Sequence, residues 1–234
     1  MSSTKATAHQ AGVLYFLFMI VAIFGEFFSP HFMVPGDAAA TARNITAAEP
    51  AYRLGILTGF VTLLLFIFLV ERLYTLFRDV DRGQALLMVL LVAVGVALAF
   101  ANLLSKFAPL VLLSGADYLS VFTKPQLDAL SLGFLRFHSN GAIVTSAFWG
   151  LWLFPFGLLV VKSRCFPRIL GILLIVAGVA YLTSSVTSMV LPQYQRIVSR
   201  IMMPLYFCEV PIIFWLLIKG ANEPTRQARP SGVS

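Results

Sequence analysis

The residues best able to do chemistry are a few polar groups inside long apolar runs, and Glu209 is the most unusual of them. It lies between Pro204 and Pro211 in the segment PLYFCEVP. It follows Arg200 by nine residues and precedes Lys219 by ten, which places it about 14 Å from either charge along a helix. An ionisable group at that depth in a membrane faces the bundle interior or a water-filled cavity, usually with a partner. Glu209 is therefore the first candidate for neutralising a ligand or carrying a proton.

The two prolines around Glu209 predict an irregular helix. Pro211 has no amide to bond the carbonyl of Phe207, and Pro204 has none for the carbonyl of Arg200. Freed carbonyls in a broken membrane helix can help to bind a cation or a polar ligand. We therefore expect a kink next to the carboxylate.

Six further residues are candidates for lining a ligand site in the same half of the membrane: Glu26, Asn102, His138, Arg200, Ser184 and Ser188. Several also have a purely structural explanation. Glu26 is close enough to the end of its helix to reach water, and Arg200 can contact lipid headgroups. Hydroxyls in TSSVTS (183–188) often bond back to their own helix or join neighbouring helices. His138 stands beside the expected interface, where water can solvate it.

The sequence has few residues of the kinds that catalyse reactions or bind metals, so no catalytic residue, metal or cofactor is expected. The chain has three histidines, His9, His31 and His138, and none of the common nucleophile, phosphate-loop or zinc motifs. An intramembrane enzyme acting on a lipid or envelope substrate stays open as an alternative. It would use His138, Glu26 and Glu209 as acid, base or metal groups.

The elements that must position these residues are membrane-spanning helices. The 234 residues are 59% hydrophobic and 12% charged, with a mean hydropathy of +0.88, whereas soluble domains are about 45–50% apolar and about 25% charged. Long apolar runs recur along the whole chain, as in all-α polytopic membrane proteins. The six expected spans are 10–29, 52–77, 85–113, 139–161, 168–190 and 198–219.

One connection and one span have features of their own. Residues 114–137 separate the third and fourth spans and carry apolar residues at helical spacing. We expect a short amphipathic helix there, lying at the outer surface. The third span is long, so it should tilt or break near Pro109. Residues 1–220 should form one membrane domain, followed by a disordered cytoplasmic tail over 221–234.

Charge predicts how the spans are oriented. The net charge of +7 fits basic residues on cytoplasmic loops better than binding to nucleic acid. The short loops RDVDRGQ (78–84) and KSRCFPR (162–168) carry this signal most clearly. Both termini are then cytoplasmic. In that orientation the inner halves of the spans are almost wholly apolar, and the outer halves hold the candidate polar residues. This asymmetry predicts an outward-facing polar cavity.

Three segments resemble a known family. FWGLWLFPFGLLVVKSRCFPRILGILLIVAGVAYL (148–182), VPGDAAATARNI (34–45) and VLLSGADYLSVF (111–122) are similar to the pattern of the bacterial membrane family called domain of unknown function 4386. The resemblance implies a six-helix protein of the bacterial inner membrane. It implies no substrate, cofactor or catalytic residue.

Three functional hypotheses follow. The first is binding or transport of a small amphipathic or cationic molecule in a cavity floored by Glu209. The second is the intramembrane enzyme described above. The third is a structural assembly partner, whose polar layer only fixes the register of the helices. Membrane lipids are expected partners in every case.

Overall fold

The computed structural model describes residues 3–28 and 32–221, and the side chains of the first segment as far as Gly25. Over these residues the chain forms helices and no strand. Six helical segments are long and apolar enough to cross a membrane: Thr4–Gly25, Glu49–Phe77, Arg82–Leu112, Lys124–Ser163, Arg168–Val190 and Pro192–Ile218. The prediction of an all-α, multi-pass membrane protein is confirmed. The tail expected from residue 221 lies, from residue 222 onward, outside the described residues.

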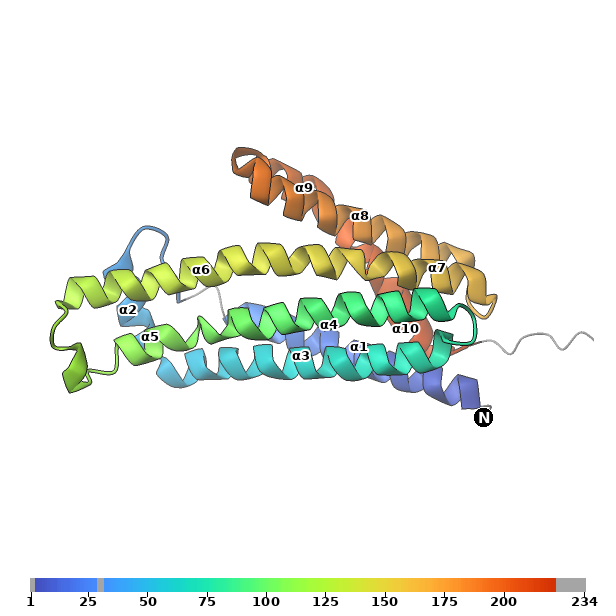
Figure 1. Ribbon diagram of the computed structural model, residues 1–234, viewed down its shortest axis with the longest axis horizontal. Helices are drawn as coiled ribbons and strands as arrows, with labels where there is room; N and C mark the ends of the chain where they lie inside the picture. Colours follow the sequence, from blue (N-terminus) through green and yellow to red (C-terminus); the bar gives the residue numbers. More distant parts are fainter. Residues whose placement is uncertain (1–2, 29–31, 222–234) are drawn as a thin grey trace, which may run out of the picture.

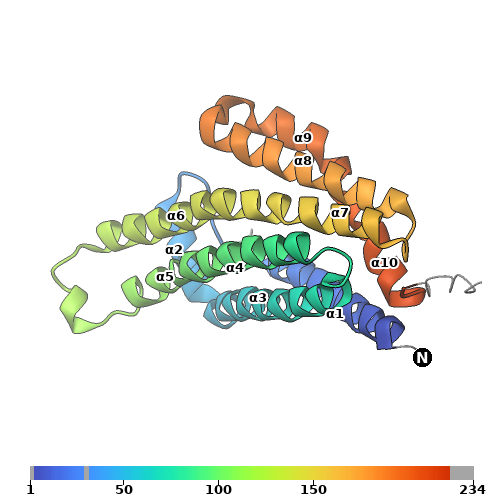
Figure 2. The same cartoon turned by 45° about the vertical axis from the view of Figure 1, so that its right-hand side comes forward.

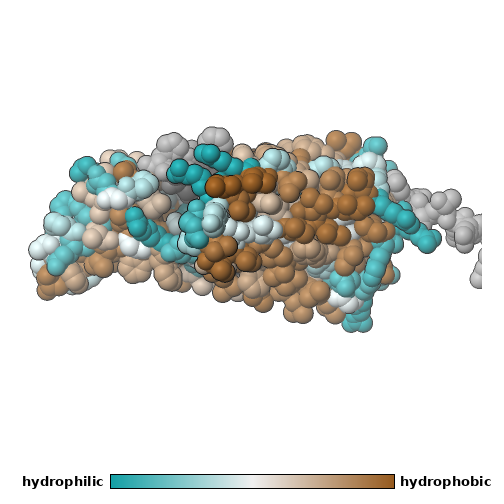
Figure 3. Space-filling view, turned by 90° about the horizontal axis from the view of Figure 1, so that it is seen from above, coloured by the Kyte–Doolittle hydropathy of each residue, from teal (hydrophilic) through white to brown (hydrophobic). Residues whose placement is uncertain are grey.

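Ten α-helices and three short 3₁₀ segments make up the described chain (Figure 1). The α-helices are α1 (Ser3–Phe28), α2 (Ala38–Ala47), α3 (Glu49–Phe77), α4 (Arg82–Leu104), α5 (Phe107–Leu112), α6 (Lys124–Leu151), α7 (Leu153–Ser163), α8 (Arg168–Val190), α9 (Gln195–Tyr206) and α10 (Val210–Ile218). The 3₁₀ segments are η1 (Asp117–Leu119), η2 (Pro192–Tyr194) and η3 (Phe207–Glu209). On the face shown in Figure 3, apolar residues cover most of the right-hand half, and hydrophilic residues gather at the right end, near the middle and toward the left end.

The first and last helices lie side by side. α1 packs along α10, and the ring Nδ1 of His9 is 3.1 Å from the carbonyl oxygen of Leu217. The start of α1 and the end of α10 therefore lie at one end of the bundle, which we call the terminal end. The opposite end, which holds α2, α5 and the start of α6, is the distal end (Figure 1).

Prolines account for the breaks inside the spans. Pro109 cannot bond the carbonyl of Ser105, and the third span divides there into α4 and α5. Pro155 leaves the carbonyl of Leu151 free, and α6 gives way to α7 at that point. Pro211 does the same for Phe207, where α9 passes into η3. The sequence predicted the first and last of these interruptions.

The connection between the third and fourth spans differs from expectation. Residues 127–137 are helical, but they form the first part of α6 and run straight into the fourth span instead of lying separately on the surface. A capping box starts the helix at Thr123, whose amide donates to the side chain of Gln126 at 2.8 Å. The inward side packs on α2 and α5, and Leu135 is buried among apolar side chains of α2, α3 and α4. The apolar side of this segment therefore packs against protein, whereas the sequence pattern had suggested a separate helix at the membrane surface.

Large buried side chains fill the bundle from its middle to the terminal end. Trp152, Tyr15, Phe66, Phe77 and Phe156 are each less than 2.5% exposed. The rings of Trp152 and Phe156 stack with centroids 5.3 Å apart, and Phe66 meets Trp152 edge-on at 5.1 Å. The terminal half is therefore a continuous packed core.

Glycines let α8 pack closely against α6 and α7. A Cβ added to Gly157 would stand 2.6 Å from the carbonyl oxygen of Gly171, and one added to Gly150 would stand 2.9 Å from that of Gly178. Gly157 follows Gly150 by seven residues, whereas its partner Gly171 precedes Gly178 by seven, as expected for antiparallel helices. These glycines thus set the distance between α8 and the helices α6 and α7 (Figure 2).

An ion pair joins two loops at the terminal end. Lys162 donates to the carboxylate of Asp81 at 2.6 Å, and Asp81 also caps α4 by accepting from the amide of Gln84 at 3.1 Å. The hydrogen bond from Lys162, with help from the capping amide, lowers the pKa of Asp81. The α3–α4 loop is thereby tied to the end of α7.

Candidate functional site

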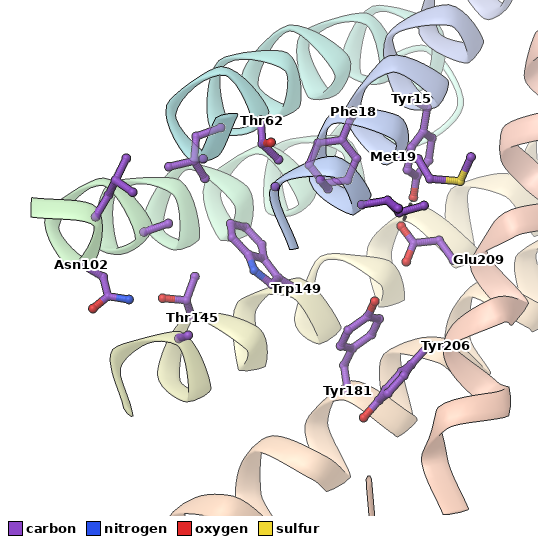
Figure 4. A pocket seen from close by; sticks show the side chains of 18 of the residues that line it. Tyr15, Phe18, Met19, Thr62, Asn102, Thr145, Trp149, Tyr181, Tyr206 and Glu209 are labelled. Carbon is purple, nitrogen blue, oxygen red and sulfur yellow. Dashed lines mark hydrogen bonds between the residues drawn. The ribbon is translucent and has the colours of Figure 1, made fainter. Parts of the chain in front are cut away.

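A cavity of about 680 Å³ lies between the middle of the bundle and its distal end. All six spans contribute to its wall, and most of the lining side chains are apolar or aromatic. Figure 4 shows its inner part, with Glu209 and Tyr15 at one end and Asn102 and Thr145 toward the other. The packed core around Trp152 lies on the terminal side of this space. The cavity therefore ends near the middle of the membrane-spanning segments.

The floor of the cavity is formed by Tyr15 and Glu209. The Tyr15 hydroxyl donates a hydrogen bond to the Glu209 carboxylate, which links α1 to the last residue of η3. Tyr15 is fully buried, and its ring lies 6.1 Å from that of Trp152. Glu209 is only partly buried and lines the cavity. The carboxylate is thus held from below by the core and open to the cavity above.

Aromatic rings stand beside this carboxylate. Tyr181 and Tyr206 lie with ring centroids 4.6 Å apart, and both line the cavity together with Trp149. The Tyr206 hydroxyl is 2.5 Å from the hydroxyl of Ser184, which fixes the ring from behind. Aromatic faces attract cations. A cavity that holds one carboxylate and three such rings is chemically suited to a positively charged organic group.

Asn102 and His138 both line the cavity, and they also join α4 to α6. The Asn102 amide nitrogen donates to the carbonyl of His138 at 2.9 Å, and the ring Nδ1 of His138 is 3.0 Å from the carbonyl of Asn102. A Cβ at Gly141 would collide with the Asn102 amide, so the amide can keep this position only with glycine there. These two candidates therefore have a structural role in addition to their place in the wall.

The other candidates lie in different surroundings. Ser184 does not line the cavity, but its hydroxyl contacts that of Tyr206, which does. Ser188 is partly buried on α8 and does not line the cavity. Arg200 is exposed on α9 and does not line the cavity. Glu26 belongs to the last turn of α1, and its side chain lies outside the described residues. Of the seven residues singled out from the sequence, the structure brings Glu209, Asn102 and His138 to one cavity.

Sequence reasoning missed the tyrosines and the tryptophan of the site. Tyr15, Trp149, Tyr181 and Tyr206 stand in apolar runs, where an aromatic residue is usually taken for core. One signal could have indicated them. Tyrosine in membrane helices concentrates at the interfaces, whereas Tyr15 and Tyr181 lie ten and nine residues from the nearer ends of their spans, at a depth similar to that of Glu209.

A cluster of metal ligands is not found in the part of the chain that the structure describes. No group of three or more His, Cys, Asp or Glu side chains comes together there. His31 and the side chain of Glu26 lie outside that part. Within it, Glu209 accepts a hydrogen bond from Tyr15.

Comparison with known proteins gives one match. The family model described as Domain of unknown function (DUF4386) matches residues 10–220, a range that includes every residue of the cavity. No protein with a curated function and no solved structure matches the chain.

Proposed function

This chain belongs to the family described as domain of unknown function DUF4386, and we propose that it binds or transports a small organic cation in its cavity. Glu209 is the counter-charge of the ligand in this proposal. The observation that carries it is a single carboxylate at the closed end of a largely apolar cavity with several aromatic rings in its wall.

The electrostatics favour a cation at this position. A unit positive charge 4 Å from a carboxylate gains about 4 kcal/mol at an effective dielectric constant of about 20. The hydrogen bond from Tyr15 supports the carboxylate, and the rings of Tyr181 and Trp149 can add cation–π attraction. The protein keeps such a charge in the membrane at a cost, and a cationic ligand offsets that cost.

The size and polarity of the cavity favour a small amphipathic molecule. Small-molecule sites commonly enclose about 300–1,000 Å³ and combine apolar walls with a few polar groups. The cavity holds about 680 Å³. An organic cation with hydrocarbon or aromatic substituents would match both its walls and its floor.

We propose further that the terminal end faces the cytoplasm of a bacterium and that the cavity opens away from it, in the inner membrane. Support comes from the basic residues of the α3–α4 and α7–α8 loops, which mark cytoplasmic sides. Cys165 lies in the second of these loops. In a Cys208→Ser background, a membrane-impermeant maleimide should label Cys165 in inverted vesicles and leave it unlabelled in intact spheroplasts; the reverse pattern contradicts the orientation.

The structural-partner hypothesis is supported by one specific observation. The reciprocal hydrogen bonds between Asn102 and His138 fix the register of α4 and α6 without needing a ligand. Under that hypothesis Glu209 and Tyr15 would only join α1 to η3. It therefore predicts a protein that discriminates poorly between ligands of opposite charge.

Two ions of the same shape test the proposal. Tetraphenylphosphonium and tetraphenylborate differ mainly in the sign of their charge. Purified protein should bind the cation, and Glu209→Gln should weaken that binding at least tenfold, or about 1.4 kcal/mol. Glu71→Gln, at an exposed site on α3, is the matched control and should bind as the wild type does. Equal binding of both ions by the wild type contradicts the proposal even if Glu209→Gln fails to fold.

A further inference from the structure

The rim of the cavity is apolar. Most lining side chains are buried or half-buried, but Ile23 on α1 is 49% exposed and Phe207 in η3 is 62% exposed. Ala142 on α6 also lines the cavity and is exposed. Lining residues that are also exposed mark the place where a cavity reaches the surface. The opening is therefore framed by α1, η3 and α6, and each helix contributes an apolar side chain to it.

The packing of the helices leaves α1 and α9 as the two sides of this opening. α1 packs mainly on α3 and α10, whereas α9 packs mainly on α8. The α8–α9 pair diverges from α6 toward the distal end in two views of the molecule (Figures 1 and 2). The distal half of α1 and the length of α9 are thus two walls that do not close against each other.

The surface next to the opening is of the kind that contacts lipid. Ile20 and Phe24 on α1 are 46% and 42% exposed, and Met203 on α9 is 58% exposed. All three belong to membrane-spanning segments. Large apolar side chains clustered around an entrance to water would be unfavourable, whereas they suit the hydrocarbon of a bilayer. The opening therefore faces sideways, toward acyl chains.

One face of α9 changes character along its length. Arg196, Arg200, Met203 and Phe207 are spaced by four, three and four residues, which places them in one stripe. The arginines are in the first half of α9, near the tip of the α8–α9 pair, where phosphate headgroups can pair with them. Met203 and Phe207 continue the stripe down to the rim. Positive charge therefore stands at the headgroup level, while the rim side chains that the structure describes are uncharged.

Positive charge on α9 also bears on the route. Arg196 and Arg200 are exposed and oppose a cation that approaches the opening from water, because like charges repel. The uncharged rim between Ile23 and Phe207 offers no such barrier. A cation that has already partitioned into the bilayer would meet the more favourable path.

We propose that the opening between α1 and α9 is a lateral portal that admits a single-chain amphiphilic cation from the bilayer. Its charged group reaches Glu209 and the rings of Tyr181 and Trp149, and its hydrocarbon chain leaves the cavity between Ile23 and Phe207. This inference rests on the proposed function and adds to it the class of ligand and its route. A chain that trails into the bilayer also explains why the rim is apolar.

The test uses a trimethylammonium compound with a twelve-carbon chain and a diazirine on the last carbon. The protein is placed in lipid nanodiscs and irradiated, and the labelled residues are mapped by mass spectrometry. The wild type should be labelled around Ile23, Met203 and Phe207, and Glu209→Gln should lose at least five-sixths of that labelling. Glu71→Gln should retain it. Excess tetraphenylphosphonium should remove the same labels.

The outcomes separate this inference from the function on which it rests. Glu209-dependent labels on the inner walls, at Gly59 or Leu103, would overturn the portal and leave the cation site standing. Equal labelling of Ile23 and Phe207 in Glu209→Gln and Glu71→Gln would show only that the compound touches the lipid-facing surface. That result would also overturn the portal. Failure of the proposed function would appear separately, as tetraphenylphosphonium binding that ignores Glu209.

Discussion

Replacing Gly55 by leucine should fill the cavity without disturbing the fold. Gly55 lies in α3, is buried and lines the cavity, and a Cβ built there meets no atom within 4 Å. A leucine side chain at this position therefore extends into the cavity. Glycine in a helix is about 0.8–1.0 kcal/mol less favourable than alanine, and leucine is close to alanine. The free energy of unfolding should consequently rise by about 0.8 kcal/mol.

Ligand binding should change in the opposite direction. The added side chain competes for the space that tetraphenylphosphonium needs, so its dissociation constant should rise at least tenfold, or about 1.4 kcal/mol. Gly133→Leu is the matched control, because a Cβ there also meets nothing within 4 Å but the residue lies on the exposed face of α6. It should gain the same stability and bind normally.

Two measurements decide the result. Reversible unfolding in mixed micelles gives the stability of both variants, and titration with radiolabelled tetraphenylphosphonium gives their dissociation constants. A Gly55→Leu protein that is less stable than the wild type would show that the space beside Gly55 is closed. A stable Gly55→Leu protein with an unchanged dissociation constant would refute the cavity as the binding site.

Three further predictions concern the rest of the bundle. Gly157→Ala should lower the free energy of unfolding by about 1–3 kcal/mol, because the new Cβ overlaps the neighbouring helix; unchanged unfolding would contradict the close packing. The pKa of Asp81 is lowered in the fold, so its contribution to stability is present above about pH 4 and is lost as the pH falls through the lowered value. Unfolding of Lys162→Gln measured from pH 6 to pH 2.5 should therefore depend less on pH than that of the wild type, and equal slopes would refute the ion pair. Asn102→Ala should cost about 1–2 kcal/mol of stability through its lost bond to His138 while tetraphenylphosphonium binding changes less than threefold; the opposite pattern in the two assays would make Asn102 a ligand contact.

Much of the fold was predictable because lipid imposes a simple rule on sequence. Spans must be apolar and helical, so their number and approximate positions follow from the apolar runs. Proline chemistry is equally local, which is why the breaks before Pro109 and Pro211 could be expected. The start of α6 was not predictable in this way. The face containing Leu135 is apolar whether it meets lipid or protein, and only the packing of α2 and α5 decides between them.

The candidate site was predictable only in Glu209, Asn102 and His138. Glu209 and Asn102 are conspicuous because apolar surroundings make such groups costly. Tyr15, Tyr181 and Trp149 carry no such signal, because aromatic residues suit a core as well as a cavity. Arg200 shows the opposite case. It is charged and was expected in the same half of the membrane as the other candidates, but its side chain is exposed on α9. The charge of a residue does not predict which face of its helix turns toward the bundle.

The most direct test of the central claim is to locate a bound cation. Tetraphenylarsonium has the shape of tetraphenylphosphonium, and its arsenic gives an anomalous signal in a crystal of the protein. The cation site predicts an arsenic peak inside the cavity, within about 6 Å of the Tyr181 or Trp149 ring and beside the Glu209 carboxylate. A peak found only on the lipid-facing surface, with the cavity free of arsenic at saturating ligand, would contradict it.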